Sequence, residues 1–163
     1  MADFLTNDEI MYTSFQPKLK LGFFASINGI PGYLIRKADR PSITNTNVTI
    51  HHINVEFYVK GKSRWETAAI ELYDPIVPSG AQAIMEWIRQ SHESTTGRDG
   101  YAAMYQKDFT IWSLGPVGDY VEEWTYKNAW IQDAKFGDWD WGSDGDPQTI
   151  SLTIRYNYPI LQY

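Results

Sequence analysis

Apolar and polar residues alternate with a period of two over much of this chain, as they do in β-strands that bury one face. An early run starts at Leu19 and ends at Asn28-Gly29, a dipeptide typical of hairpin turns. Further strands are predicted over residues 33–37, 64–73, 105–113, 121–131 and 136–141. The clearest run covers residues 148–158, where one parity is apolar or aromatic throughout: Ile150, Leu152, Ile154, Tyr156 and Tyr158.

Residues 40–63 are less regular. Pro41 and several Thr and Asn residues favour a loop over residues 40–47. Residues 48–60 are interpreted as one long strand in which the apolar parity changes midway, which predicts a β-bulge near His51-His52. Gly61-Lys62-Ser63 then predicts a turn.

One segment has helical periodicity. Ser79 and Gln82 have the spacing of a capping box, which marks a helix start. The apolar residues that follow at helical spacing predict one stripe facing the sheets: Ala81, Ile84, Met85 and Ile88.

The pattern predicts a mostly β fold: an antiparallel β-sandwich or barrel of about seven or eight strands with one α-helix packed against it. A chain of 163 residues has the size of one domain. Residues 1–17 lack periodicity and end at Pro17, so we interpret them as an N-terminal arm. Residues 18–163 form the predicted β-domain.

Composition narrows the possible functions. A formal charge of −6 argues against a surface that grips nucleic acid, because phosphate binding requires clustered Lys and Arg. The absence of cysteine excludes a disulfide, a thiol nucleophile and a thiolate metal site. The sequence shows neither a leader pattern nor an apolar run of bilayer length, so we expect a soluble protein without a membrane anchor. Seven Trp, eleven Tyr and seven Phe favour strands and interfaces.

The residues that could carry chemistry do not form a site in the sequence. His51 and His52 are adjacent and would point to opposite faces of a strand, so we expect no metal site there. The acidic stretch around Asp140 resembles a calcium loop, but its twelfth position is Ser151 instead of a bidentate Glu. A carbohydrate hydrolase would need paired carboxylates beside stacking aromatics, whereas a strand over residues 136–141 puts Asp138 and Asp140 on one face and Trp139 and Trp141 on the other. We therefore expect no catalytic residue, metal or cofactor.

The C-terminal third resembles the tail tube proteins of contractile-tailed bacteriophages. The resemblance rests on Ala129-Trp130, on Phe136-Gly137-Asp138-Trp139-Asp140-Trp141, and on the strand that contains Gln148-Thr149 and ends in Tyr156-Asn157-Tyr158. Upstream, Arg64-Trp65-Glu66 and the helix around Met85-Glu86-Trp87 are similar to the centre of that family. Many members have Pro where this chain has Ile131.

This resemblance implies an architectural function. Members form homohexameric rings that stack into a hollow tube inside a contractile sheath, between a baseplate initiator and a tail terminator. Genome DNA passes through the lumen without specific binding. The implied location is the virion tail, assembled in the cytoplasm of the host bacterium.

The resemblance also suggests roles for individual residues. The extended loop that reaches the neighbouring ring corresponds to residues 40–60, and the hypothetical ring or subunit contacts are Asn45, Thr46, Asn47, His51, His52 and Arg64. The polar parity of the last strand would face the lumen: Thr149, Ser151, Thr153, Arg155 and Asn157.

Two alternatives remain open. The same fold would serve the tube of a type VI secretion system or of an extracellular contractile injection particle, with protein as cargo. A carbohydrate-binding β-sandwich would instead be a stable monomer with an exposed aromatic patch.

Overall fold

The structure, a computed structural model, describes residues 16–162. Most of the predicted arm of residues 1–17 therefore lies outside the described residues. The described part is mostly antiparallel β, with one seven-stranded hydrogen-bonded sheet and two two-stranded sheets. This confirms the predicted fold class.

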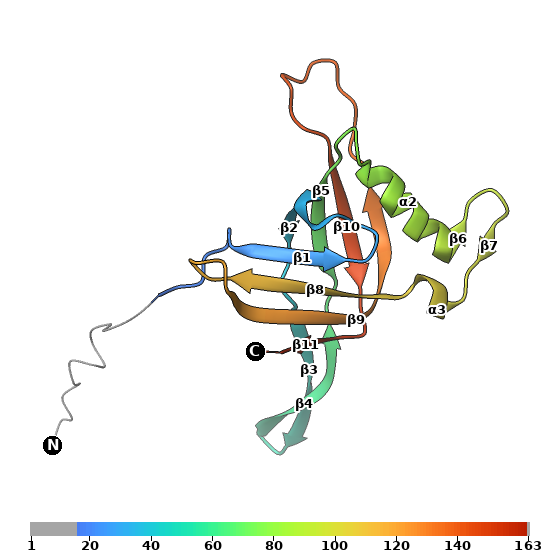
Figure 1. Cartoon of the computed structure of the whole chain (residues 1–163). Helices are drawn as coiled ribbons and strands as arrows, with labels where there is room; N and C mark the ends of the chain where they lie inside the picture. Colours follow the sequence, from blue (N-terminus) through green and yellow to red (C-terminus); the bar gives the residue numbers. More distant parts are fainter. Residues whose placement is uncertain (1–15, 163) are drawn as a thin grey trace.

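The seven-stranded sheet has two halves that share one long strand. One half contains β1 (Phe23–Ile27), β8 (Lys107–Leu114) and the first part of β9 (Tyr120–Lys135), with β11 (Tyr158–Leu161) on the far side of β9. The other half contains the rest of β9, β10 (Thr149–Arg155), β5 (Ala68–Tyr73) and β2 (Ile35–Ala38). Figure 1 shows the strands of the two halves running across one another.

The change of direction in β9 occurs at Asn128, whose φ of 53° lies in the left-handed region that Asn tolerates. Asp108 holds the bend, because its Oδ1 accepts a hydrogen bond from the Asn128 amide at 2.9 Å and its Oδ2 accepts one from Lys127 at 2.7 Å. These hydrogen bonds lower the pKa of Asp108. A sixteen-residue strand can thus pair in both halves of the fold.

The core lies where the two halves and the helix meet. Tyr126 of β9 stacks on Phe109 of β8 at 4.3 Å between ring centroids, and its edge contacts Tyr156 at 4.9 Å. The predicted apolar parity of the last strand is buried from Ile150 to Tyr156. Tyr158 departs from that prediction, because it belongs to β11 and is half-exposed.

The predicted helix is α2 (Gly80–Ser91), and the Ser79 hydroxyl accepts a hydrogen bond from the Gln82 amide at 3.4 Å. Ile84 and Trp87 are its buried anchors, and the Trp87 indole donates to the Tyr105 carbonyl at 2.6 Å. Shorter elements follow the helix: β6 (His92–Glu93), β7 (Arg98–Asp99) and α3 (Ala102–Tyr105). The 3-10 turn η1 (Gly32–Leu34) lies elsewhere, between β1 and β2. None of the helices in the described residues has the length and apolar character needed to cross a bilayer.

The predictions for residues 40–63 were wrong. They form a hairpin of β3 (Ile43–His52) and β4 (Val55–Trp65), so the predicted loop is largely strand. The change of parity marks the two-residue turn Ile53-Asn54 instead of a bulge. The bulge lies at Gly61, where a turn was predicted, since Asn45 pairs with Ser63 and Asn47 with Lys60.

Two other predictions need correction. Asn28-Gly29 is a turn that closes a single bridge between Ile27 and Ile30, but the strands on either side do not pair: β1 pairs with β8, and β2 pairs with β5. Residues 136–141 are not a strand and belong to a long loop over residues 136–148. Asp138 and Asp140 therefore do not share a strand face.

Candidate assembly surface

The hairpin β3–β4 extends away from the body of the molecule (Figure 1). One of its two faces is apolar. Val48 pairs with Val59, and Ile50 pairs with Phe57, so these side chains lie on the same side of the hairpin. The apolar members of this hairpin face are all about half exposed: Val48 52%, Ile50 50%, Val55 54%, Phe57 57% and Val59 50%. A contiguous apolar face of this kind is typical of an interface.

The opposite face of the hairpin is mostly polar, with Tyr58 as its aromatic member. Asn47 pairs with Lys60, and His51 pairs with Glu56, with the His51 Nδ1 atom 3.3 Å from Glu56 Oε1. The six predicted contact residues all lie on this hairpin and are exposed: Asn45, Thr46, Asn47, His51, His52 and Arg64. Of these, Asn45, Asn47 and His51 lie on the polar face, whereas His52 pairs with Val55 and lies on the apolar face. In residues 16–162, no group of three His, Cys, Asp or Glu side chains could hold a metal ion.

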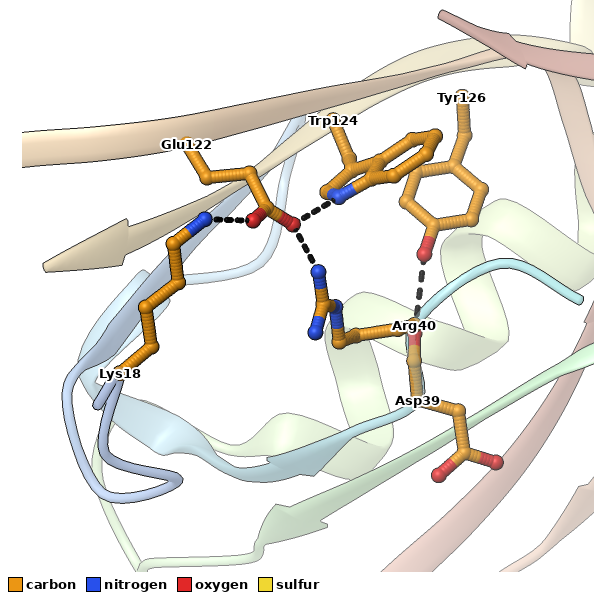
Figure 2. A network of polar contacts seen from close by, with 6 residues as sticks. All are labelled: Lys18, Asp39, Arg40, Glu122, Trp124 and Tyr126. Atoms are coloured by element: carbon orange, nitrogen blue, oxygen red, sulfur yellow. Dashed lines mark hydrogen bonds and ion pairs between the residues drawn. The ribbon is translucent and has the colours of Figure 1, made fainter. Parts of the chain in front are cut away.

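A buried carboxylate fixes the base of the hairpin. Glu122 of β9 is only 5% exposed and accepts hydrogen bonds from Lys18, Arg40 and the Trp124 indole (Figure 2). Burial raises the pKa of this carboxyl, but the three donors together outweigh burial and lower the pKa to about 2. Beside it, the Tyr126 hydroxyl donates to the Asp39 carbonyl at 2.9 Å.

The Glu122 network joins three distant parts of the chain. Lys18 follows the predicted arm, Arg40 leads into β3, and Glu122 lies on the central strand. Sequence analysis did not single out Glu122. The available signal was its position in the strand: Glu122 lies on the same side of β9 as Trp124 and Tyr126, and that side packs inward.

The predicted lumen residues lie on one side of β10 or just beyond it. Ser151 is exposed, whereas Thr149, Thr153 and Arg155 are partly buried. Asn157 follows the end of β10, and its amide donates to the Lys127 carbonyl at 3.0 Å. The start of α2, at Gly80, lies beside Ile150 on the other, apolar side of β10, so the polar side faces away from the core.

The loop over residues 136–148 is the second projecting feature (Figure 1). Trp139 and Trp141 are fully exposed on it. The Gln148 side chain closes its base by donating to the carbonyls of Phe136 and Asp138, each at 3.1 Å.

No protein-family model matches this chain, and no curated protein matches it either. Several solved structures, in contrast, match this chain in fold. A chain in the cryo-EM structure of the anti-feeding prophage tube-terminating cap has a TM-score of 0.71 at 17% identity, covering 96% of this chain and 99% of the other. A chain in the sheath-tube complex of an extracellular contractile injection system in the extended state has a TM-score of 0.67 at 17% identity, covering 98% and 99%.

A chain in the sheath/tube terminator structure of that injection system gives a TM-score of 0.69 at 20% identity, covering 93% of this chain and 100% of the other. These identities are low, and the agreement is in the fold. The chain has the fold found in the tube, cap and terminator assemblies of contractile injection systems.

Proposed function

We propose that this chain is a structural subunit of the hollow inner tube of a contractile tail, built from stacked hexameric rings. The observation that carries the proposal is the apolar hairpin face, which lies outside the core of its own subunit. A two-stranded hairpin is marginally stable alone in water. Burial of a half-exposed Val, Ile or Phe contributes roughly 1 kcal/mol, so five such residues give a substantial gain when a second copy covers them.

The remaining surfaces fit the same role. The six polar hairpin residues that were predicted as contacts would meet the neighbouring subunit or ring. The polar side of β10 would line a water-filled lumen. Ring closure would also pair strand edges that are otherwise open to aggregation. Residues 1–17 would act as an arm on the domain of residues 18–163, and the sheath, a baseplate initiator and a terminator would be the other partners.

Two versions of the tube differ in cargo. In a phage tail, assembled in the host cytoplasm and carried by the virion, DNA would pass through the lumen, and the net charge of −6 favours passage without binding. In an extracellular injection particle, the cargo would be protein. The fold match to chains of such particles supports this second version. In both versions the role is mechanical and requires no catalysis.

Negative-stain electron microscopy of the purified chain at low and high concentration tests the proposal. We expect six-fold rings or hollow tubes of uniform width. Monomers that remain dispersed at every concentration and bind glycans on an array would contradict the tube and support a carbohydrate-binding module.

A further inference from the structure

The loop over residues 136–148 combines exposed aromatic surface with negative charge. Trp139 and Trp141 are 96% and 107% exposed, so the loop leaves both indoles in solvent. Its four carboxylates and its lack of Lys and Arg give a formal charge of −4, from Asp138, Asp140, Asp144 and Asp146. In the described residues, the hydrogen bonds of residues 140–146 are internal to the loop. Exposed tryptophans of this kind are typical of binding anchors.

A cleft elsewhere on the molecule has the complementary character. It has a volume of about 460 Å³ and lies between β1, β8, β9 and β2. Aromatic rings from Phe23, Trp112 and Trp124 line it. Its charged lining has five cationic and two anionic side chains, a formal +3: Lys18, Lys20, Arg36, Lys37 and Arg40 against Asp39 and Glu122. Three of these cations are paired within the subunit, Lys18 and Arg40 with Glu122 and Arg36 with Glu71. Among the described residues, Lys20 and Lys37 are the cations of the cleft without an ion pair.

The loop and the cleft belong to opposite ends of β9. Glu122 and Trp124 lie in the first five residues of this strand, whereas the loop begins immediately after Lys135, its last residue. Figure 1 shows the loop projecting from a different side of the molecule than the start of β9. The loop of one subunit therefore does not fill the cleft of the same subunit.

We propose that the loop over residues 136–148 of one copy docks in the cationic aromatic cleft of a second copy. In the alternating sequence Asp138-Trp139-Asp140-Trp141, the two carboxylates can pair with Lys and Arg side chains of the cleft. The two indoles can stack on the aromatic rings of the cleft and contact its cations. A contact between two different surfaces of the same chain is head-to-tail, and such contacts generate rings or filaments. This inference rests on the proposed self-assembly and assigns one of its contacts.

Cross-linking tests this contact cleanly because the chain has no cysteine. Ser143→Cys places a thiol in the loop and leaves both tryptophans in place, and Lys37→Cys places one in the cleft. The two variants, one of them carrying a larger tag, are mixed and treated with a short bismaleimide. We expect a mixed covalent dimer that is lost when Gln82→Cys, on the exposed surface of α2, replaces Lys37→Cys.

Two further variants test the chemistry of the contact. Replacing both Trp139 and Trp141 by Ser in the Ser143→Cys chain should lower the mixed dimer roughly tenfold or more, as expected for interface anchors. Lys20→Glu in the Lys37→Cys chain should also lower it, and 1 M salt should reproduce part of that loss.

Absence of the mixed dimer overturns the inference. If rings or tubes are seen in the same sample, the proposed function stands and the loop docks elsewhere. If Asp8→Cys, in the acidic N-terminal residues, cross-links to Lys37→Cys instead, that segment occupies the cleft and the inference is also wrong.

Discussion

Arg40 and Glu122 are 82 positions apart, and the guanidinium of Arg40 donates to the buried carboxylate of Glu122. Arg40 lies just before β3, and Glu122 lies on the shared strand β9. This ion pair therefore joins the base of the projecting hairpin to the centre of the molecule. Truncating one partner of a buried pair is costly, because the other charge is left without compensation.

Glu122→Gln should destabilise the fold by about 3 kcal/mol near neutral pH. The folded pKa of Glu122 is depressed to about 2 from an ordinary 4.5. Its contribution is therefore complete above pH 4.5 and is lost as the pH falls toward 2. Urea unfolding of both chains across this range should show their difference shrinking toward low pH. Glu123→Gln is the control, and a Glu122→Gln difference independent of pH would contradict the role of this carboxylate.

Tyr126 and Tyr156 should respond differently to loss of the hydroxyl. Tyr126→Phe removes the hydrogen bond to the Asp39 carbonyl and should cost about 1 kcal/mol. Tyr156→Phe should cost less, because the buried Tyr156 hydroxyl makes no hydrogen bond of normal geometry among the described residues and only a weak one with the Ser42 backbone. Urea unfolding midpoints of the two variants make the comparison, and equal losses would contradict it.

Gly61 is required by the close approach of the two hairpin strands. A Cβ atom at this position would lie 2.5 Å from the Thr46 Oγ1 atom and 3.0 Å from the Thr46 carbonyl oxygen. Gly61→Val should therefore open the hairpin while the core remains folded. Hydrogen exchange of the β3 and β4 amides should accelerate, with a nearly unchanged global unfolding midpoint. Ser63→Val, on the same strand, should leave exchange slow, and slow exchange in Gly61→Val would show that the bulge tolerates a side chain.

The lumen assignment predicts a size-dependent accessibility at Ser151. In Ser151→Cys monomers, a small maleimide and a bulky polymer-linked maleimide should both react. In assembled tubes, only the small reagent should react. Gln82→Cys is the matched control, since the start of α2 lies on the other side of β10. Reaction of Ser151→Cys with the bulky reagent along intact tubes would place this strand on the outside.

The parts of the fold that sequence analysis predicted have strong local signals. The alternation from Ile150 to Tyr156 matches a buried strand face, and Ser79 caps α2 as its spacing from Gln82 predicts. Both features depend on neighbours in the sequence, so periodicity and capping chemistry identify them.

The hairpin could not be predicted in the same way, because its turn chemistry is unusual. Ile53 adopts a φ of 54°, a conformation that β-branched residues rarely take, so Ile53-Asn54 lacks the glycine that marks most such turns. At Gly61 the opposite error occurred: a turn was predicted and a bulge was found, because a glycine inside a strand also marks a bulge. The change of parity at residue 53 was the available signal, and it fits a turn as well as a bulge.

The loop over residues 136–148 imitates a strand in the sequence. Asp138, Trp139, Asp140 and Trp141 alternate with a period of two, but the structure leaves both tryptophans in solvent. Alternation predicts a strand only when one parity has a core or a partner to face. Here the partner belongs to another molecule in our account, and the sequence of one chain does not contain that information.

The central claim is that a second copy of this chain covers the apolar face of the hairpin. Electron microscopy of two matched variants tests it most directly: Ile50→Asp puts a charge on the apolar face, and Thr49→Asp puts the same charge on the polar face one residue away. Both variants should keep the circular dichroism spectrum and unfolding midpoint of the unmodified chain. We predict rings or tubes from the unmodified chain and from Thr49→Asp, and only dispersed monomers from Ile50→Asp. Normal tubes from Ile50→Asp would contradict the account.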